Sequence, residues 1–306
     1  MNDIVLSPKA AVEATPEEVN WPLKNIELAG LRWSASENSG DSCPILMLHG
    51  WLDNSLTFAH LAPGLARGRD LYAVDMAGHG HSGHRPDGQS YLLMDYVSDL
   101  AELIEHYFDH APGHKVDLIG HSLGGIVCVL YAAAFPEHVR NLVMIDSLGP
   151  ISRPPEDTIP KLRQAIRKRM TGSGKPVVYP DPQTAAKARE GGLSPLSPEA
   201  ALTLIPRNMK AVDGGFVWRT DPRLRHPSIM MLEESQVLAS LREVRTRTLF
   251  IQAESGLLSH RKGWEPRLKA IPRMETVTVP GGHHCHFDGD IEPVSHAIRE
   301  FISHDS

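Results

Sequence analysis

The sequence predicts an α/β fold in which a mostly parallel sheet carries helices on both faces. Short apolar runs that lack alternation, at 44–50, 70–78, 115–122 and 141–147, are typical of strands buried on both faces. Amphipathic stretches such as 91–110 separate these runs, as the crossover helices of a parallel sheet require. The composition then changes after residue 150, which indicates an insertion into this fold.

The chain of 306 residues is long enough for one large α/β domain with an insertion. Its three cysteines are odd in number and scattered, so no disulfide framework is expected and a cytoplasmic location is indicated. A net charge of −6 argues against a nucleic-acid surface, and no run reaches the roughly 18 apolar residues of a membrane span. We therefore expect a small-molecule substrate, without a nucleic-acid partner or a membrane span. The oligomeric state is left open.

The chain divides into three predicted regions. Residues 1–24 lack an apolar stretch and are expected to form an N-terminal tail and not a signal peptide. The core domain is predicted over 25–149 and 241–306, where two later strand-like runs and a closing amphipathic helix continue the pattern. Residues 150–240 are rich in Pro, Arg and Gly and contain short helical stretches, which predicts an inserted helical cap.

The motif GHSLGG at 120–125 is the first candidate for chemistry. It follows a predicted strand and precedes an apolar helical stretch, which is the context of a nucleophile elbow. Glycine at 120 and at 124 leaves the space that a sharp turn needs, so that the hydroxyl of Ser122 stands clear of the backbone. We therefore predict Ser122 as a nucleophile, with an ordinary structural turn as the alternative.

The motif HGWLDN at 49–54 ends an earlier strand and predicts part of an oxyanion hole. A loop at this place directs a backbone N–H toward the oxygen on which negative charge develops. We predict that the N–H groups of Trp51 and of Leu123, which follows the nucleophile, supply this site.

The motif GGHHCHFD at 281–288 follows the last predicted strand and supplies a general base. Histidine accepts and returns protons near neutral pH, and we predict His283 as the base, with His284 as the alternative. Together with Cys285 and His286 the same residues offer metal ligands. Adjacent residues on an extended segment point in opposite directions, however, and no second cluster completes a tetrahedral site. We therefore predict no metal and no other cofactor.

The acid that would orient the histidine is less clear. In the chain order Ser, acid, His it follows a strand between Ser122 and His283. Asp146 ends one strand-like run and Glu254 ends a later one. Asp146 is preferred and Glu254 is kept as the alternative, while a third interpretation makes Asp146 a cap at the entry to the insertion.

Over residues 25–303 the order of these motifs resembles the α/β-hydrolase superfamily. HGWLDN, GHSLGG, GFVWRTDPRLRHPS at 215–228 and PGGHHCH are most similar to the serine hydrolase-like proteins. The resemblance implies the α/β-hydrolase fold and a helical cap over the serine. Members place the acid after either of two strands, and many use the place that holds Gly256 here. The segment 215–228 would line or brace the pocket, with Trp218 and Arg219, beside Trp51, as substrate-binding residues.

The expected function is that of a carboxylesterase-like serine hydrolase, which cleaves an ester or related acyl bond through a Ser-His-Asp/Glu triad and an acyl-enzyme. Serine at the elbow argues against dehalogenases and epoxide hydrolases. Two alternatives stay open: a non-catalytic small-ligand binding protein, and carbon–carbon hydrolase or cofactor-free haloperoxidase chemistry on the same residues. Arg219, Arg223 and Arg225 are candidates for meeting an acidic substrate group, although such arginines more often form ion pairs.

Overall fold

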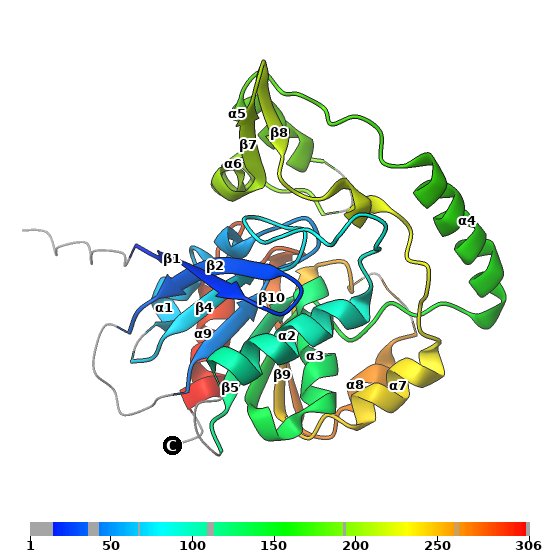
Figure 1. The fold of residues 1–306 in the computed structure, drawn as a ribbon. Coiled ribbons are helices and arrows are strands. Elements are labelled where there is room, and N and C mark those ends of the chain that lie inside the picture. The colour runs from blue at the N-terminus through cyan, green and yellow to red at the C-terminus, as the bar shows by residue number, and fades with distance from the viewer. Residues whose placement is uncertain are drawn as a thin grey trace, which may run out of the picture.

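An eight-stranded sheet forms the centre of the computed structural model (Figure 1). Its strand order is β1-β2-β4-β3-β5-β6-β9-β10. The strands are β1 Glu17–Pro22, β2 Glu27–Trp33, β3 Ile45–Leu48, β4 Leu71–Asp75, β5 Val116–His121, β6 Val139–Ile145, β9 Arg247–Ser255 and β10 Met274–Gly282. The structure describes residues 15–35, 43–66, 68–108, 113–191, 194–259, 261 and 263–303.

The predicted mostly parallel sheet is confirmed. From β4 through β10 all neighbouring strands are parallel, and only β1 and β2 run antiparallel to their neighbours. Strands β3 and β5 are wholly buried, as their unbroken apolar sequence requires. Parallel strands end at the same edge of a sheet, so the residues that follow β5, β6 and β10 meet there.

Helices cover both faces of the sheet (Figure 1). One face packs against α2 Leu93–Tyr107, α3 Leu123–Ala134, α7 Glu234–Arg242 and α8 Glu265–Ala270, whose buried side chains join one apolar cluster. The other face packs against α1 Ala62–Leu65 and α9 Glu292–Ser303 in a second cluster. Among the described residues no helix combines the length and the apolar character needed to cross a membrane.

The prediction of an N-terminal tail over 1–24 is wrong for its last part. Residues Glu17–Pro22 form β1, which pairs with β2 at the edge of the sheet. Trp21 is 5% exposed and lies edge-on to Tyr72. An edge strand buried through one aromatic side chain carries a weak apolar pattern, which is why sequence reasoning missed it. Residues 1–14 of the predicted tail lie outside the described residues.

The segment 150–240 forms a separate layer above the carboxyl edge of the strands (Figure 1). It contains more than the predicted helices, because β7 (Met209–Val212) and β8 (Gly215–Trp218) form an antiparallel hairpin. Each of these strands has four residues, too few for a clear period in the sequence. Helix α7 crosses the predicted end of the insertion at residue 240, and its Val237 and Leu241 pack in the sheet's core, so the predicted boundary is wrong and the inserted layer ends before Glu234. The elements of the layer are α4 Thr158–Thr171, α5 Pro182–Ala186, η4 Lys187–Arg189, α6 Pro198–Asn208, β7 Met209–Val212, β8 Gly215–Trp218 and η5 Pro222–Arg225.

Gly124 sets how closely α3 approaches the sheet. A Cβ at this position would lie 2.0 Å from the carbonyl oxygen of Leu48, a backbone atom of β3 that cannot rotate away. We expect Gly124→Ala to lower the free energy of unfolding by about 3 kcal/mol, measured by urea titration. Gly191→Ala is the matched control, because its Cβ would have no atom within 4 Å. Equal urea midpoints for the two variants would contradict the expectation.

Candidate active site

Ser122 stands on a strained turn between β5 and α3. Its backbone angles are φ 51° and ψ −114°, which a residue with a side chain rarely adopts. Its N–H donates to the carbonyl of Ile145 (3.2 Å), and the N–H of Gly124 donates to the carbonyl of His49 (3.0 Å). The turn is therefore tied to the neighbouring strand β6 and to the loop after β3. This geometry leaves the Ser122 side chain partly exposed at the carboxyl edge of the sheet.

His283 and Asp146 form a direct contact at the same edge. The Nδ1 atom of His283 lies 2.6 Å from Oδ2 of Asp146, and both side chains are buried. A carboxylate only accepts, so Nδ1 carries the proton and Nε2 is left as the acceptor of a neutral ring. The N–H of Leu257 also donates to this Oδ2 (2.9 Å), which fixes the carboxylate.

The two alternative residues lie elsewhere. Glu254 is exposed near the end of β9, and its carboxylate has no ion pair or hydrogen bond in the described part of the chain. His284 is buried, but its Nε2 lies 3.1 Å from Asp53 Oδ2. The structure thus brings His283 to Asp146 and leaves Glu254 and His284 outside that pair.

Gly256 makes room for the Asp146 carboxylate. A Cβ on Gly256 would lie 2.5 Å from either carboxylate oxygen, closer than any real contact. A side chain after β9 and an acid after β6 therefore compete for the same space. The glycine at position 256 is therefore what allows the carboxylate of Asp146, which follows the neighbouring strand, to occupy this space.

A cavity of about 530 Å³ opens beside Ser122 and beneath the 150–240 segment. Trp51, Leu123 and Trp218 line it, as does His283. Leu123 begins α3, so its N–H has no partner within the helix. The Trp51 side chain is 47% exposed, and its Nε1 donates to the carbonyl of Leu224 (3.1 Å).

Arg219 lies apart from this cavity. Its side chain is not among the lining residues, and its Nε donates to the carbonyl of Met209 (3.0 Å). Arg219 therefore braces the β7–β8 hairpin and does not face the predicted pocket, contrary to the expectation that it binds substrate.

Asp53 is a residue of the site that sequence reasoning did not single out. It is buried and links three elements: Arg189 of η4 contacts Oδ1 (2.5 Å), and His284 and His121 face Oδ2 at 3.1 and 3.8 Å. Burial acts to raise the pKa of Asp53, but His284 and Arg189 more than offset this and hold that pKa well below its ordinary value. The available signal was the aspartate in HGWLDN.

The same group is also the set most suited to hold a metal ion among the described residues. Ligand atoms of Asp53, His121 and His284 lie within 4.8 Å of one another. The set combines the end of strand β5 with two loops that are distant in sequence, so the spacing of the histidines along the chain did not reveal it. Arg189 already balances the charge of Asp53 in the arrangement described here.

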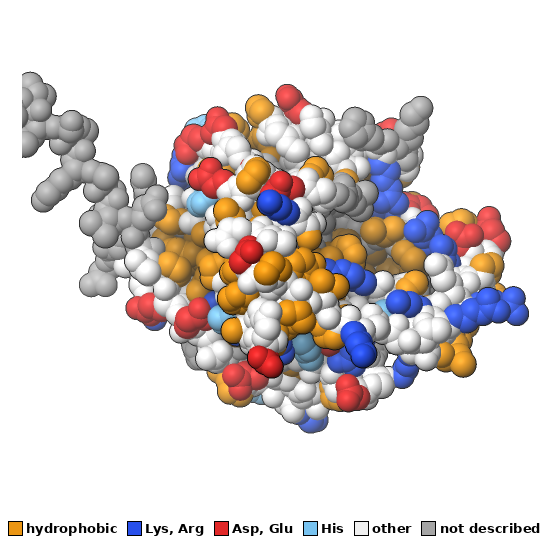
Figure 2. Space-filling model, turned by 90° about the horizontal axis from the view of Figure 1, so that it is seen from above, with side chains coloured by type: hydrophobic (Ala, Val, Ile, Leu, Met, Phe, Trp, Pro, Cys, Tyr) orange, Lys and Arg blue, Asp and Glu red, His pale blue; other side chains and the backbone are white. Residues whose placement is uncertain are grey.

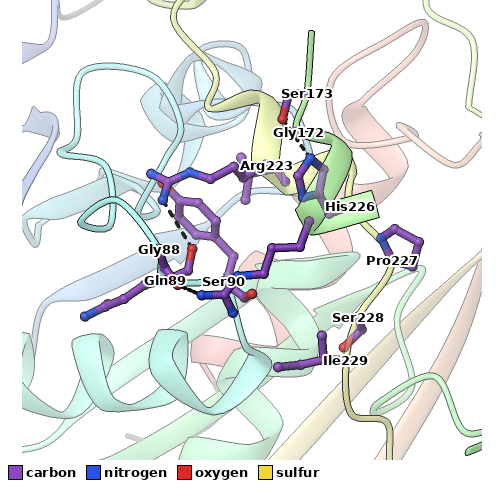
Figure 3. Close-up of a pocket in the computed structure, with 13 residues that line it drawn as sticks. Gly88, Gln89, Ser90, Gly172, Ser173, Arg223, His226, Pro227, Ser228 and Ile229 are labelled. Carbon is purple, nitrogen blue, oxygen red and sulfur yellow. Dashed lines mark hydrogen bonds between the residues drawn. The ribbon is translucent and has the colours of Figure 1, made fainter. Parts of the chain in front are cut away.

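A second cavity of about 320 Å³ lies between α4 and the loop around Gly88 (Figure 3). Ser173 and His226 are hydrogen-bonded in it (Oγ to Nε2, 2.7 Å). Ser173 follows the end of α4 in a loop, so this pair lacks the strand and helix that hold Ser122. No carboxylate in the described residues bonds to the other nitrogen of His226. The pair lacks the features of an activated nucleophile.

Four buried histidines make the stability of the fold depend on pH. Burial lowers the pKa of His49, His121 and His286, and it lowers that of His79 to about 3. In the unfolded chain a histidine has a pKa of about 6.5. Below that pH the unfolded chain therefore binds protons that the buried histidines of the folded protein do not bind. The contribution of these histidines to stability is therefore present above about pH 6.5 and is lost as the pH falls below it. For His79, His121 and His286, whose pKa values are strongly lowered, the loss is about 1.4 kcal/mol per histidine per pH unit.

We expect the free energy of unfolding at about pH 5.5 to be lower by roughly 4 kcal/mol than at about pH 7.5, because His79, His121 and His286 stay uncharged in the folded protein over this interval. Urea titrations at the two pH values measure this difference. Coincident urea midpoints would contradict the expectation.

A serine on a strand-to-helix elbow, a histidine after the last strand and a parallel sheet with an inserted layer together define an α/β hydrolase. The chain belongs to the α/β hydrolase fold family, whose model matches residues 44–290. It is a serine hydrolase. It is 32% identical to the serine hydrolase-like protein of Danio rerio over 93% of this chain and 88% of the relative.

Two further comparisons agree. A serine hydrolase-like protein of Dictyostelium discoideum is 30% identical over 90% of this chain and 79% of its own length. The crystal structure of a hypothetical protein from Pseudomonas aeruginosa PAO1 superposes with a TM-score of 0.86 at 36% identity and covers 94% of this chain and 99% of that one. The predicted family and fold are therefore confirmed.

Proposed function

We propose that the protein is a carboxylesterase-like hydrolase of small-molecule esters or related acyl compounds, with Ser122, His283 and Asp146 as its catalytic triad. The observation that carries this proposal is the 2.6 Å contact between His283 Nδ1 and Asp146 Oδ2 beside the strained turn of Ser122. Both Ser122 and His283 line the large cavity, so a bound carbonyl group reaches them together.

The reaction proceeds in two steps. His283 Nε2 takes the proton of Ser122 as Oγ attacks the carbonyl carbon, and Asp146 stabilises the imidazolium that forms. The N–H groups of Trp51 and Leu123 bind the oxyanion. His283 then gives the proton to the leaving alcohol, whose bond to the carbonyl carbon breaks. Water, deprotonated by His283, attacks the acyl-enzyme and releases the acid and Ser122.

The 150–240 segment acts as a cap in this proposal. Arg207 of α6 pairs with the buried Asp75 (Nη2 to Oδ2, 2.6 Å), and Asn54 Nδ2 donates to the carbonyl of Leu204 (2.9 Å). With the contact between Arg189 and Asp53 these interactions hold the segment on the loops of the core. The cap thus encloses the substrate and limits access of water.

Labelling with a fluorophosphonate tests the proposal. This reagent phosphonylates a serine only when a base activates its hydroxyl. We expect one adduct per chain, located by mass spectrometry on the peptide that holds Ser122. We also expect hydrolysis of 4-nitrophenyl butyrate. Absence of both adduct and turnover would favour the non-catalytic binding protein, while an adduct on Ser173 would move the site to the second cavity.

A further inference from the structure

Two cavities of different character meet at the candidate nucleophile. Besides the large one, a cavity of about 270 Å³ shares Ser122 and His283 with it. Its other walls are mostly apolar, from Ile126, Leu148, Ile151, Leu257, Leu258 and Trp264. Arg261 and Arg267 also line this cavity, and Arg267 is paired with Glu234 (2.5 Å). A scissile carbonyl at Ser122 therefore has one apolar side and one side beneath the cap.

Arg225 is an arginine without a partner on the cap side. It is exposed and lines the large cavity, and no hydrogen bond or ion pair of its guanidinium occurs in the described part of the chain. Other arginines of this region are engaged: Arg189 with Asp53, and Arg223 with Asp221 (2.7 Å). The sequence-based expectation that cap arginines form ion pairs therefore fails at Arg225.

Arg225 also faces a second cation. Arg189 lines the same cavity. Although Arg225 is exposed as a whole residue, the partial burial of its guanidinium and the charge of Arg189 both lower its pKa, but an arginine stays protonated. Two like charges at one cavity repel each other unless an anion lies between them. Arg189 is compensated by Asp53, which leaves the positive charge of Arg225 available to a ligand.

The cap segment carries a net positive charge, although the net charge of the whole protein is negative. Residues 150–240 carry 14 lysines and arginines against nine aspartates and glutamates, whereas the entire chain has a net charge of −6. Seen from above, Lys and Arg side chains gather over α4 and border a hollow with hydrophobic walls (Figure 2). Such a distribution attracts anionic small molecules toward the cap.

We propose that the natural substrate is an amphiphilic acyl compound with an apolar group on one side of the scissile carbonyl and an anionic group on the other, bound by Arg225 in the large cavity. The anionic group is a carboxylate or a phosphate, both of which accept paired hydrogen bonds from a guanidinium. This inference rests on the proposed function. It adds the position of the charge and the residue that recognises it.

Matched ester pairs test the inference. The first pair is the 4-nitrophenyl monoester of glutarate and its neutral methyl-capped counterpart, with the charge on the acyl side. The second pair is 4-carboxyphenyl pentanoate and its methyl ester, with the charge on the leaving group. We expect wild-type kcat/KM to favour the anionic member of at least one pair by about tenfold, because the guanidinium forms charge-assisted hydrogen bonds with it.

Arg225→Met is expected to abolish this preference through a rise in KM for the anionic ester of about tenfold, with kcat and the neutral ester changed less than twofold. Arg167→Met is the matched control, since Arg167 is exposed on α4 and lines neither cavity at Ser122. The preference of the wild type is also expected to shrink between about 20 mM and about 500 mM salt, because salt screens an accessible ion pair.

The outcomes separate the two proposals. If the wild type hydrolyses none of the neutral esters, the proposed function is overturned. Turnover of neutral esters with equal kcat/KM for both members of each pair would overturn only the inference about Arg225. A preference that survives in Arg225→Met would equally exclude this residue as the anion site.

Discussion

Replacing Ser122 by alanine is expected to lower kcat for 4-nitrophenyl butyrate by about 10⁶-fold. The variant lacks the oxygen that forms the acyl-enzyme, while the oxyanion donors and the cavity remain. A residual rate of about 10³-fold above that in water is therefore expected from binding and oxyanion stabilisation alone. Steady-state kinetics on freshly purified protein measure the effect, with thermal denaturation to show that the variant folds.

Ser173→Ala is the control for the nucleophile. Its hydroxyl also contacts a histidine, His226, but in the other cavity. We expect kcat within twofold of the wild type for this variant. A Ser122→Ala enzyme with unaltered kcat would show that another residue is the nucleophile, and a large loss in Ser173→Ala would identify which one.

Asp146→Asn is expected to lower kcat by about 10⁴-fold with little change in KM. The amide nitrogen of an asparagine donates a hydrogen bond to the histidine, so Nδ1 loses its proton and Nε2 keeps one. A protonated Nε2 cannot accept the proton of Ser122. The N–H of Leu257 and Nδ1 of His283 share one oxygen, Oδ2, so an amide nitrogen turned toward His283 also leaves the N–H of Leu257 without its acceptor.

Glu254→Gln is the matched control for the acid. Glu254 is exposed and makes no contact with His283, so kcat is expected to stay within twofold of the wild type. The measurement is kcat for both variants across pH 6 to 9. The reverse pattern, a large loss in Glu254→Gln and a small one in Asp146→Asn, would overturn the assignment of the acid.

The sequence predicted the fold through local signals that are strong in buried parallel strands. The strands β3, β4, β5, β6 and β9 appear as apolar runs because both of their faces are covered. The edge strand β1 and the hairpin β7–β8 were missed, since each is short and only partly buried. Their stability depends on neighbours distant in sequence, which a window of adjacent residues does not contain.

The sequence predicted which types of residue form the candidate site, but it did not decide which acidic residue contacts His283. Asp146 follows β6 and Glu254 lies near the end of β9, at one edge of the sheet, and only the three-dimensional positions separate them. The contact with His283 and the space left by Gly256 supply that information. Asp53, Arg189 and His284 come from three regions that are distant in sequence. No single sequence motif therefore predicts the contacts of Asp53 with Arg189 and His284. The triad roles stay predictions until the variants are measured.

The close packing of Gly256 on Asp146 restricts how this enzyme can change over generations. An aspartate introduced at 256 collides with the existing carboxylate, and loss of the carboxylate at 146 alone leaves the imidazole without its anchor. Under the proposed triad, each single change is therefore expected to disable the protein. An acid placed after the neighbouring strand is expected to require substitutions at both positions.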